Sequence, residues 1–246
     1  MKKTLLTAAL LTLMACTASA AGLNLGWNDC PSGGAYLHDM AFACASNSGA
    51  ETMIGSYIPP AGLLEVNGNE AVIDLQTDQT ALSPWWNMGT ASGCTGRTTT
   101  PVLSDFGFAS FFGCTDYWGP AGGASGGGGY LPQFQSVPNR ARIVIVAAIL
   151  EANATSEDPS TEYYSFKVII SNARTVGSPN CPGCTDAACL VFNSLKITQN
   201  VTQTLNPTVT TAAVSNYVTW RGGLQPDCQA TPARQTTWGS VKALYR

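Results

Sequence analysis

Charged residues are scarce in this chain. Asp, Glu, Lys and Arg make up 11% of its 246 residues, whereas soluble domains usually carry about 25%. The 12 basic residues are outnumbered by 15 acidic ones, which leaves a formal net charge of −3. Without a basic patch, the protein lacks the surface that binders of nucleic acid or anionic membranes need. The Thr, Ser, Asn and Gly residues that take the place of charges are typical of an extracellular β-protein.

Histidine is nearly absent, since His38 is the only one. A Ser or Cys triad would depend on this one residue, and a zinc site would need further ligands. Asp39 follows it directly and is the one carboxylate placed to orient a histidine base; a plain loop position is the alternative. The sequence therefore predicts no catalytic residue, no metal and no cofactor.

Long helical periodicity is also missing, and an alternation of period two takes its place. It is clearest at residues 162–172, where one face of the expected strand carries Tyr164, Phe166, Val168 and Ile170. After a start that contains Arg140 and Arg142, residues 140–150 are apolar on both faces, which predicts a central strand covered on both sides. Further strands are expected at 23–27, 52–58, 190–199 and 217–220.

Three connecting segments have recognisable turn chemistry. Residues 62–76 predict a hairpin around Asn67-Gly68-Asn69, because Asn-Gly favours the positive φ of tight turns. Residues 83–89 predict a short helix, with Ser83 as its cap and Pro84 in its first position. The glycine-rich residues 119–129 predict an insertion loop without regular structure.

These expected elements define a fold class. About nine strands, with turns between them and no helix pairs, predict two packed antiparallel sheets. We therefore expect an all-β protein, an antiparallel β-sandwich of the Ig, jelly-roll or cohesin-like kind with disulfide-bonded loops. Residues 21–246 would form one domain that carries 119–129 as an insertion, and a linker between two domains is the alternative interpretation of that loop.

The N-terminus has the pattern of an export signal. Met1-Lys2-Lys3 is basic, residues 4–15 are uncharged and mostly apolar, and Ala18-Ser19-Ala20 resembles a cleavage site. We expect residues 1–20 to be a signal peptide, too short for a permanent membrane span. The mature protein would then be secreted to the periplasm or the cell exterior. Alternatively, Cys16 lies in a lipobox and anchors a lipoprotein.

An even number of cysteines remains after the leader: Cys30, Cys44, Cys94, Cys114, Cys181, Cys184, Cys189 and Cys228. In an oxidising compartment they predict four disulfides. Proximity in the sequence favours Cys30 with Cys44 and Cys94 with Cys114, which leaves Cys228 for one of the remaining three. Cys181-Pro182-Gly183-Cys184 has the spacing of a redox or zinc pair, but expected strands flank it on both sides, so we interpret these thiols as structural.

Other motifs give weaker evidence for a catalytic or metal-binding site. Gly123-Ala124-Ser125-Gly126-Gly127 matches a G-x-S-x-G nucleophile elbow, but it leads into a glycine run instead of a helix. A glycoside hydrolase needs two carboxylates, and no spacing selects a pair among Glu65, Glu70, Asp74, Asp105 and Asp116. The acidic residues at 157–162 could bind calcium, although they lack the alternating ligand pattern of an EF-hand. A solvated acidic turn is the alternative.

Aromatic residues provide the best hint of a ligand. They concentrate around the Cys94–Cys114 region as Trp85, Trp86, Phe106, Phe108, Phe111, Phe112, Tyr117 and Trp118. Flat rings among neutral polar neighbours stack on sugar rings, and the alternative is that they form the bulk of the core. As a hypothesis, we assign sugar contact to Trp85, Trp86 and Trp118.

Four segments of the chain resemble a family of uncharacterised secreted bacterial proteins. They are Leu25-Gly26-Trp27-Asn28-Asp29-Cys30, residues 71–76, residues 162–167 and the TWGxxKxLYR-like ending at 237–246. The resemblance implies export but no activity and no site residues. The order of strands is also similar, more loosely, to cohesin-like and carbohydrate-binding sandwiches, a likeness of architecture alone.

Together these observations predict a secreted protein without enzymatic activity, which binds or has a structural role at the cell surface. Its expected partner is a glycan or a surface protein. The alternatives are self-assembly as a subunit of an extracellular filament or surface assembly, a carbohydrate-binding module, and a secreted hydrolase. We expect no nucleic-acid partner and no membrane span.

Overall fold

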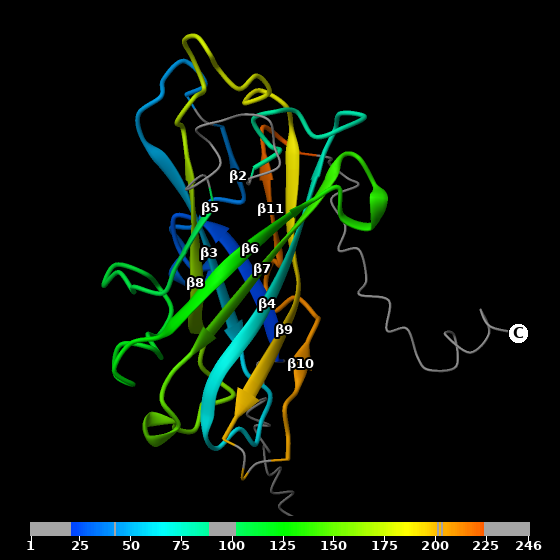
Figure 1. Ribbon diagram of the computed structural model, residues 1–246. Helices are drawn as coiled ribbons and strands as arrows, with labels where there is room; N and C mark the ends of the chain where they lie inside the picture. Colours follow the sequence, from blue (N-terminus) through cyan, green and yellow to red (C-terminus); the bar gives the residue numbers. More distant parts are fainter. Residues whose placement is uncertain (1–20, 42, 89–101, 201, 203, 224–246) are drawn as a thin grey trace, which may run out of the picture.

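The computed structural model describes residues 21–41, 43–88, 102–200, 202 and 204–223. Two β-sheets pack face to face in this part of the chain (Figure 1), which confirms the expected all-β sandwich. It contains eleven strands instead of about nine. The expected signal peptide, Cys16, Cys94, Cys228 and the ending 237–246 lie outside the described residues.

The smaller sheet has four strands. Their order is β1 (Gly22–Trp27), β3 (Ala50–Ile58), β8 (Tyr163–Ser171) and β5 (Val102–Asp105). All its neighbouring strands run antiparallel. The predicted alternation in β8 is confirmed, because Tyr164, Phe166, Val168 and Ile170 are all fully buried.

The larger sheet has seven strands. Six follow the order β2 (Asp39–Met40), β11 (Tyr217–Trp220), β9 (Ala188–Gln199), β4 (Val66–Thr77), β7 (Arg140–Ala148) and β6 (Ser125–Pro132), while β10 (Thr208–Val209) pairs with β9. Among these pairs only β2–β11 is parallel. Three short 3-10 turns complete the elements: Pro31–Gly33, Phe134–Ser136 and Glu151–Asn153.

Strand β7 differs from its prediction. It lies between β4 and β6, but only its inner residues Ala141, Ile143, Ile145 and Ala147 are buried. On the outer face Val144 is half-buried and Val146 is exposed. The sheet is therefore covered on one side, because no second layer packs on its outer face among the described residues.

The predicted hairpin at 62–76 is wrong, because β4 runs without a turn from Val66 to Thr77. Gly68 pairs with Ala148 on one side and Thr198 on the other, and the register with β9 shifts beside it. A side chain at Gly68 would meet the Ala147 carbonyl oxygen at 2.5 Å. The glycine therefore permits the close approach of strand β7 at a bulge.

The predicted loop at 119–129 is also wrong in its second half, because Ser125–Pro132 forms strand β6. Its glycines form a ladder with the apolar strand β7. A side chain at Gly126 would lie 1.9 Å from the Val146 carbonyl oxygen, so glycine is required at that position. Backbone pairing with a neighbour that is distant in sequence thus overrides the low strand propensity of glycine.

The helix predicted at 83–89 is a single turn at Pro84–Trp86. One backbone hydrogen bond with the four-residue spacing of an α-helix forms, from the Asn87 N–H to the Ser83 carbonyl oxygen. The next backbone N–H, that of Met88, bonds to the Trp86 carbonyl oxygen instead. The segment bends inward because both tryptophans of the turn are drawn into the core.

Disulfides tie distant loops together and do not follow proximity in the sequence. Cys30 bonds to Cys114, and Cys44 bonds to Cys184. Both predicted short-range pairs are therefore wrong, since each included a member of the Cys30–Cys114 bridge. Cys181 and Cys189 are also disulfide-bonded, so the structural interpretation of Cys181-Pro182-Gly183-Cys184 is confirmed.

The edge strands on the two sides of the sandwich differ in their backbone pairing. The edge of β1 is paired with the segment 211–215, through the N–H groups of Leu23 and Leu25 and the Leu23 carbonyl oxygen. On the opposite side, β5 and β6 are the outermost strands of their sheets and are not paired with each other. A cleft opens on this β5/β6 side of the molecule.

Candidate ligand-binding cleft

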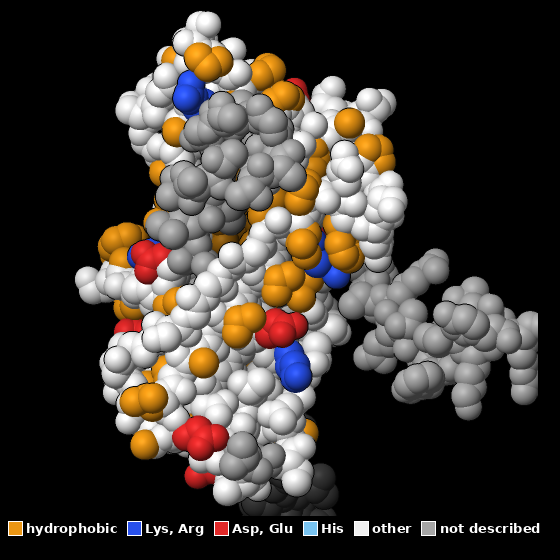
Figure 2. All heavy atoms as spheres, viewed as in Figure 1, with side chains coloured by type: hydrophobic (Ala, Val, Ile, Leu, Met, Phe, Trp, Pro, Cys, Tyr) orange, Lys and Arg blue, Asp and Glu red, His pale blue; other side chains and the backbone are white. Residues whose placement is uncertain are grey.

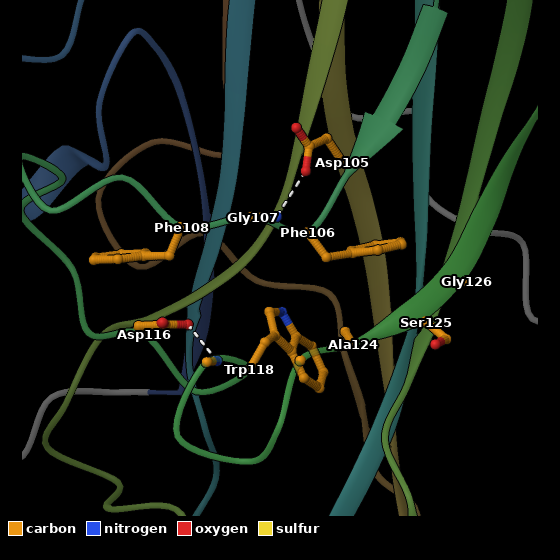
Figure 3. A pocket seen from close by; sticks show the side chains of 11 residues that line it. Asp105, Phe106, Gly107, Phe108, Asp116, Trp118, Ala124, Ser125 and Gly126 are labelled. Atoms are coloured by element: carbon orange, nitrogen blue, oxygen red, sulfur yellow. Dashed lines mark hydrogen bonds between the residues drawn. The ribbon is translucent and has the colours of Figure 1, made fainter.

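The cleft lies where the end of β5 meets the start of β6 (Figure 3). It has a volume of about 580 Å³. Two sequence regions build it, the loop 105–108 after β5 and the segment 116–126, which runs from a turn into β6. Because the two regions come from different sheets, the cleft spans the gap between the two layers of the sandwich.

Aromatic rings form the floor and sides of this cleft. Phe106, Phe108 and Trp118 line it, and Figure 3 shows the two phenylalanine rings on either side of the indole. Phe108 is held by edge-on contacts with Phe112 and Tyr164. The opposite wall carries only small residues from Gly123 to Gly126, which leaves the rings accessible to a flat ligand.

Asp105 is a carboxylate that the fold keeps ionised. Its Oδ1 accepts the Gly107 N–H at 2.7 Å, and its Oδ2 lies 3.1 Å from the Lys167 Nζ. Partial burial raises the pKa of Asp105, but the Gly107 N–H and Lys167 outweigh this effect and lower the pKa from its ordinary value. Lys167 also donates to the Gly107 carbonyl oxygen at 2.8 Å, which holds the loop in place.

Asp116 is the second carboxylate of the cleft. It is half-buried, and its Oδ1 accepts the Gly119 N–H at 3.0 Å. A side chain at Gly119 would lie 2.2 Å from the other carboxylate oxygen, so the glycine allows the tight turn that presents Asp116. Asp116 also borders a second hollow of about 310 Å³, which Tyr117, Asn153 and Tyr163 line from the other side.

The tryptophans predicted to contact sugar are not exposed. Trp85 and Trp86 are 0% exposed and Trp118 is 1% exposed. Trp85 and Trp86 pack against Trp220, with ring centroids 6.0 and 5.9 Å away. Their indole N–H groups donate to Thr175 and to the Asp186 carbonyl oxygen.

The hypothesis of an exposed three-tryptophan platform is therefore wrong, because these rings are buried in the core. Trp118 alone reaches a cleft, through the rim of a ring whose N–H is bound to the Ser165 carbonyl oxygen. The aromatic surface of this cleft instead comes mainly from Phe106 and Phe108, to which the sequence analysis assigned no sugar contact.

Of the carboxylates considered for hydrolysis, the structure brings Asp105 and Asp116 to one cleft. Asp74 is instead paired with Arg142 on the larger sheet, at 2.6 Å. Glu65 accepts a hydrogen bond from Thr202, and Glu70 is exposed on β4. Spacing in the sequence could not single out the pair, because Asp105 and Asp116 meet only through the packing of the two loops.

The acidic residues at 157–162 do not converge on a calcium site. Glu157 is buried and accepts a hydrogen bond from the Tyr57 hydroxyl group. Asp158 is exposed and bonds to Ser160. Glu162 points into the smaller sheet, where its carboxylate accepts bonds from Asn24, Ser56 and the Ser32 N–H. The solvated-turn alternative holds only for Asp158.

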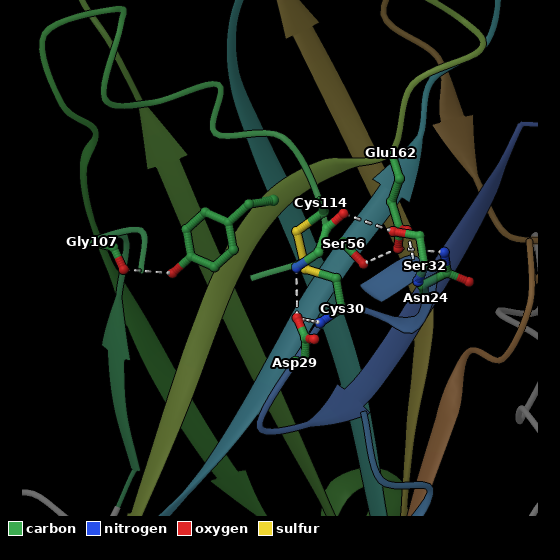
Figure 4. Close-up of a disulfide and its surroundings, with 10 residues drawn as sticks. Asn24, Asp29, Cys30, Ser32, Ser56, Gly107, Cys114 and Glu162 are labelled. Carbon is green, nitrogen blue, oxygen red and sulfur yellow. Dashed lines mark hydrogen bonds between the residues drawn. A yellow bond between two sulfur atoms is a disulfide. The ribbon is translucent and has the colours of Figure 1, made fainter. Parts of the chain in front are cut away.

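Glu162 helps to organise the loops around the first disulfide (Figure 4). Its Oε1 accepts hydrogen bonds from the Asn24 side-chain amide at 2.6 Å and from the Ser56 hydroxyl group at 2.5 Å, next to the Cys30–Cys114 bridge. Asp29 links the loop that contains Cys30 to the loop that contains Cys114, because its Oδ1 accepts both the Cys30 N–H and the Gly113 N–H. The covalent bridge and these charged hydrogen bonds hold the segment that leads on to Asp116.

The remaining residues that the sequence singled out make structural contacts and are not arranged as a catalytic site. His38 lies in the loop before β2, with its ring against Tyr217. Asp39 accepts bonds from Thr219 and the Gly222 N–H instead of orienting the imidazole. Partial burial lowers the pKa of His38 against the opposing effect of Asp39. Ser125 begins a strand, so it is not at a nucleophile elbow.

The fold and the cleft define a disulfide-bonded β-sandwich with an open aromatic and acidic cleft at one side. No protein-family model matches the chain, and searches of curated proteins and of solved structures found no similar protein. Among the described residues, no helix is both long and apolar enough to cross a membrane.

Proposed function

We propose that the protein is an exported binding protein without enzymatic activity, and that its cleft recognises a sugar of a surface glycan. The observation that carries this proposal is the cleft of Phe106, Phe108, Asp105 and Asp116 beside a glycine wall. Aromatic faces stack on the C–H face of a sugar ring. Carboxylates accept hydrogen bonds from its hydroxyl groups.

The charge of Asp105 suits the binding of hydroxyl groups better than the general-acid role of a hydrolase. A glycoside hydrolase needs a general acid whose pKa is raised so that it holds a proton. The pKa of Asp105 is lowered, by the Gly107 N–H and Lys167, so this carboxylate serves as an acceptor. Ionised acceptors that are held in place by the backbone suit the recognition of hydroxyl groups.

Export remains part of the proposal. The described disulfides support an oxidising environment such as the periplasm or the cell exterior. The leader at 1–20 and the resemblance to secreted bacterial proteins support the same route, with lipid attachment at Cys16 as the alternative form. A location at the cell surface would bring the cleft close to envelope and extracellular polysaccharides.

Glycan binding is tested with the purified mature protein on a glycan array, followed by titration calorimetry with the best oligosaccharide. We expect Phe106→Ala and Asp116→Asn each to weaken binding by about tenfold or more, since each removes one contact worth roughly 1.4 kcal/mol. Asparagine retains the oxygen that accepts the Gly119 N–H, so Asp116→Asn should leave the melting temperature nearly unchanged.

Two matched controls come from the same region. Phe111 belongs to the same aromatic loop but is 74% exposed and does not line the cleft. Asp158 is an exposed carboxylate away from it. Phe111→Ala and Asp158→Asn should therefore keep full affinity. Equal losses in the controls and the cleft variants, or no binding to any glycan, would contradict the proposal.

A further inference from the structure

The cleft beside β5 and β6 is acidic as well as aromatic. Of the described residues that line it, Asp105 and Asp116 are charged and none is Lys or Arg. Its other large side chains are Phe106, Phe108 and Trp118. Figure 2 shows apolar and acidic side chains together on the side of the molecule where the loop after β5 lies in Figure 1. These residues therefore offer a ligand negative charge and ring surface, and no positive charge.

The two carboxylates of the cleft differ in how their charges are compensated. The Oδ2 of Asp105 lies 3.1 Å from the Lys167 Nζ, and its Oδ1 accepts the Gly107 N–H. Asp116 accepts the Gly119 N–H but forms no salt bridge with any described residue. It is half-buried, so water screens its charge less than at an open surface. The charge of Asp116 is therefore the one that a ligand would neutralise.

Both carboxylates act on the same part of the aromatic wall. Tyr164 packs edge-on against Phe108, with ring centroids 5.6 Å apart, and its hydroxyl group donates to the Asp105 carbonyl oxygen at 2.8 Å. Burial raises the pKa of Tyr164, and the charges of Asp105 and Asp116 raise it further. The potentials of the two carboxylates therefore add at the cleft, which attracts a positively charged ligand.

A protonated amine suits this cleft better than a metal ion does. Cations are attracted to the faces of aromatic rings, and more strongly where the rings are partly desolvated. Phe106 and Phe108 are both half-buried. An amine needs only one carboxylate beside such a ring. Among the described residues, no group of three or more His, Cys, Asp or Glu side chains could hold a metal ion.

We propose that the sugar recognised by the cleft is an amino sugar, whose protonated amine pairs with Asp116 among the aromatic rings. This inference rests on the proposed function, since it names the class of sugar. The small residues at 123–126 leave room for the sugar ring, and the volume of about 580 Å³ lies within the range of roughly 300–1,000 Å³ that is usual for small-ligand sites. An acetylated amine is neutral, so it would leave Asp116 without a counter-charge.

Three tetrasaccharides with the same linkage test this inference: those of glucose, N-acetylglucosamine and glucosamine. They differ in one substituent of each ring, which is a hydroxyl group, an acetylated amine or a free amine. Binding to the mature protein is measured by titration calorimetry in a mildly acidic buffer, in which the free amine is protonated. We expect the glucosamine tetramer to bind about tenfold or more tightly than either of the others. The amine preference is the dissociation constant of the glucose tetramer divided by that of the glucosamine tetramer.

Removing the charge of Asp116 should remove most of the amine preference. Asp116→Asn keeps the size of the side chain and an oxygen that accepts the Gly119 N–H. The matched control is Asp78→Asn, at an exposed carboxylate that follows the end of β4. The cleft lies near the other end of β4, because Ser125 pairs with Ala148, which pairs with Gly68. Asp78→Asn removes the same unit of charge from the protein and should keep the amine preference.

A change at Lys167 should act in the opposite direction. Lys167→Gln leaves the charge of Asp105 uncompensated, while the glutamine amide can still donate to the Gly107 carbonyl oxygen that Lys167 contacts. We expect the amine preference to rise by about threefold, which corresponds to the strength of a partly exposed ion pair. If Lys167 only supported the loop, its replacement would weaken both tetramers equally and leave the amine preference unchanged.

The outcomes separate this inference from the proposed function. Equal binding of the three tetramers, or binding of neutral glycans alone, would overturn the inference and leave sugar recognition intact. An amine preference that neither Asp116→Asn nor Lys167→Gln changes would place the amine outside this cleft and also overturn the inference. The absence of binding to every glycan would overturn both.

Discussion

Glu157 is a carboxyl group that the fold buries against an aromatic cluster. Its side chain is 4% exposed, it accepts a hydrogen bond from Tyr57, and its Oε2 has no hydrogen-bond partner among the described residues. Burial raises the pKa of Glu157 to about 7, and the hydrogen bond from Tyr57 opposes this effect only in part. The folded protein therefore holds a proton here more tightly than the unfolded chain does.

The stability of the protein should depend on pH through this residue. The protonated form is favoured in the folded state, so its contribution is complete below about pH 4.5 and is lost as the pH rises through about 7. The shift corresponds to roughly 3 kcal/mol between pH 4 and pH 8. Urea unfolding across this range should show the decline, and Glu157→Gln should remove most of it.

The control is Glu151→Gln, at an exposed position in the last 3-10 turn. It should leave the pH dependence as it is in the natural protein. Glutamine at 157 keeps an oxygen that accepts the Tyr57 hydroxyl, so the variant tests the charge and not the contact. A pH dependence that persists in Glu157→Gln would assign it to other groups.

At the scale of the element, the pairing of β3 with β8 shows how a small residue makes room for a large one. Gly55 lies opposite Phe166, next to a shift in the register of the two strands. A side chain at Gly55 would lie 2.1 Å from the Phe166 ring. Phe166 also packs edge-on against Phe192 of the other sheet, so the ring has little room to move.

Gly55→Ala should therefore destabilise the protein by about 2 kcal/mol, because overpacking a core forces backbone or ring shifts. Chemical denaturation measures the loss. The double variant Gly55→Ala with Phe166→Leu should recover part of it, since leucine leaves space for the methyl group. Gly127→Ala, on the open face of β6, should change stability by much less. A small effect at Gly55 would mean that the ring moves aside freely.

The elements also show where prediction from sequence succeeds. β8 was predictable because one face is apolar and the other is not, and this alternation needs no knowledge of neighbours. β6 was not predictable, since its glycines have no strand preference and become a strand only beside β7. In β4, the Asn67-Gly68 pair has the chemistry of a turn, but pairing on both sides of the strand outweighs it.

At the scale of the whole molecule, disulfides join loops that the sheets bring together. Cys44 and Cys184 are separated by 140 residues, and their bridge connects the loop after β2 to the loop before β9. In the chain-entropy description, a bridge that closes a long loop strongly restricts the unfolded state. Other bridges already restrict the same chain, which reduces the effect of each one.

Replacing both cysteines, as Cys44→Ser with Cys184→Ser, should lower the free energy of unfolding by about 2–4 kcal/mol. The fold should persist, because the core of the two sheets does not depend on this bridge. Thermal unfolding followed by circular dichroism measures the change. Alkylation of the native protein should label none of Cys30, Cys44, Cys114 and Cys184. Labelling of these thiols without reductant would contradict the bonded state.

The candidate cleft belongs to this largest scale, and the sequence named its parts without their arrangement. Phe106 and Phe108 belonged to the aromatic cluster that the sequence singled out, and Asp105 and Asp116 to its list of acidic residues, but sugar contact was assigned to tryptophans, of which Trp85 and Trp86 are buried. Composition cannot tell a core ring from an accessible one, because both are selected for large apolar area. Only the packing of the 105–108 loop against the start of β6 separates them.

The sequence by itself determined the all-β class and the inward faces of the longest strands, because periodicity is a local property of the chain. It also indicated that the cysteines serve as structural bridges. The tertiary structure alone decided which cysteines pair, which aromatic rings are buried and which carboxylates share a cleft. Each of these depends on contacts between segments that are distant in the sequence, and the local residue pattern does not determine the energy of such contacts.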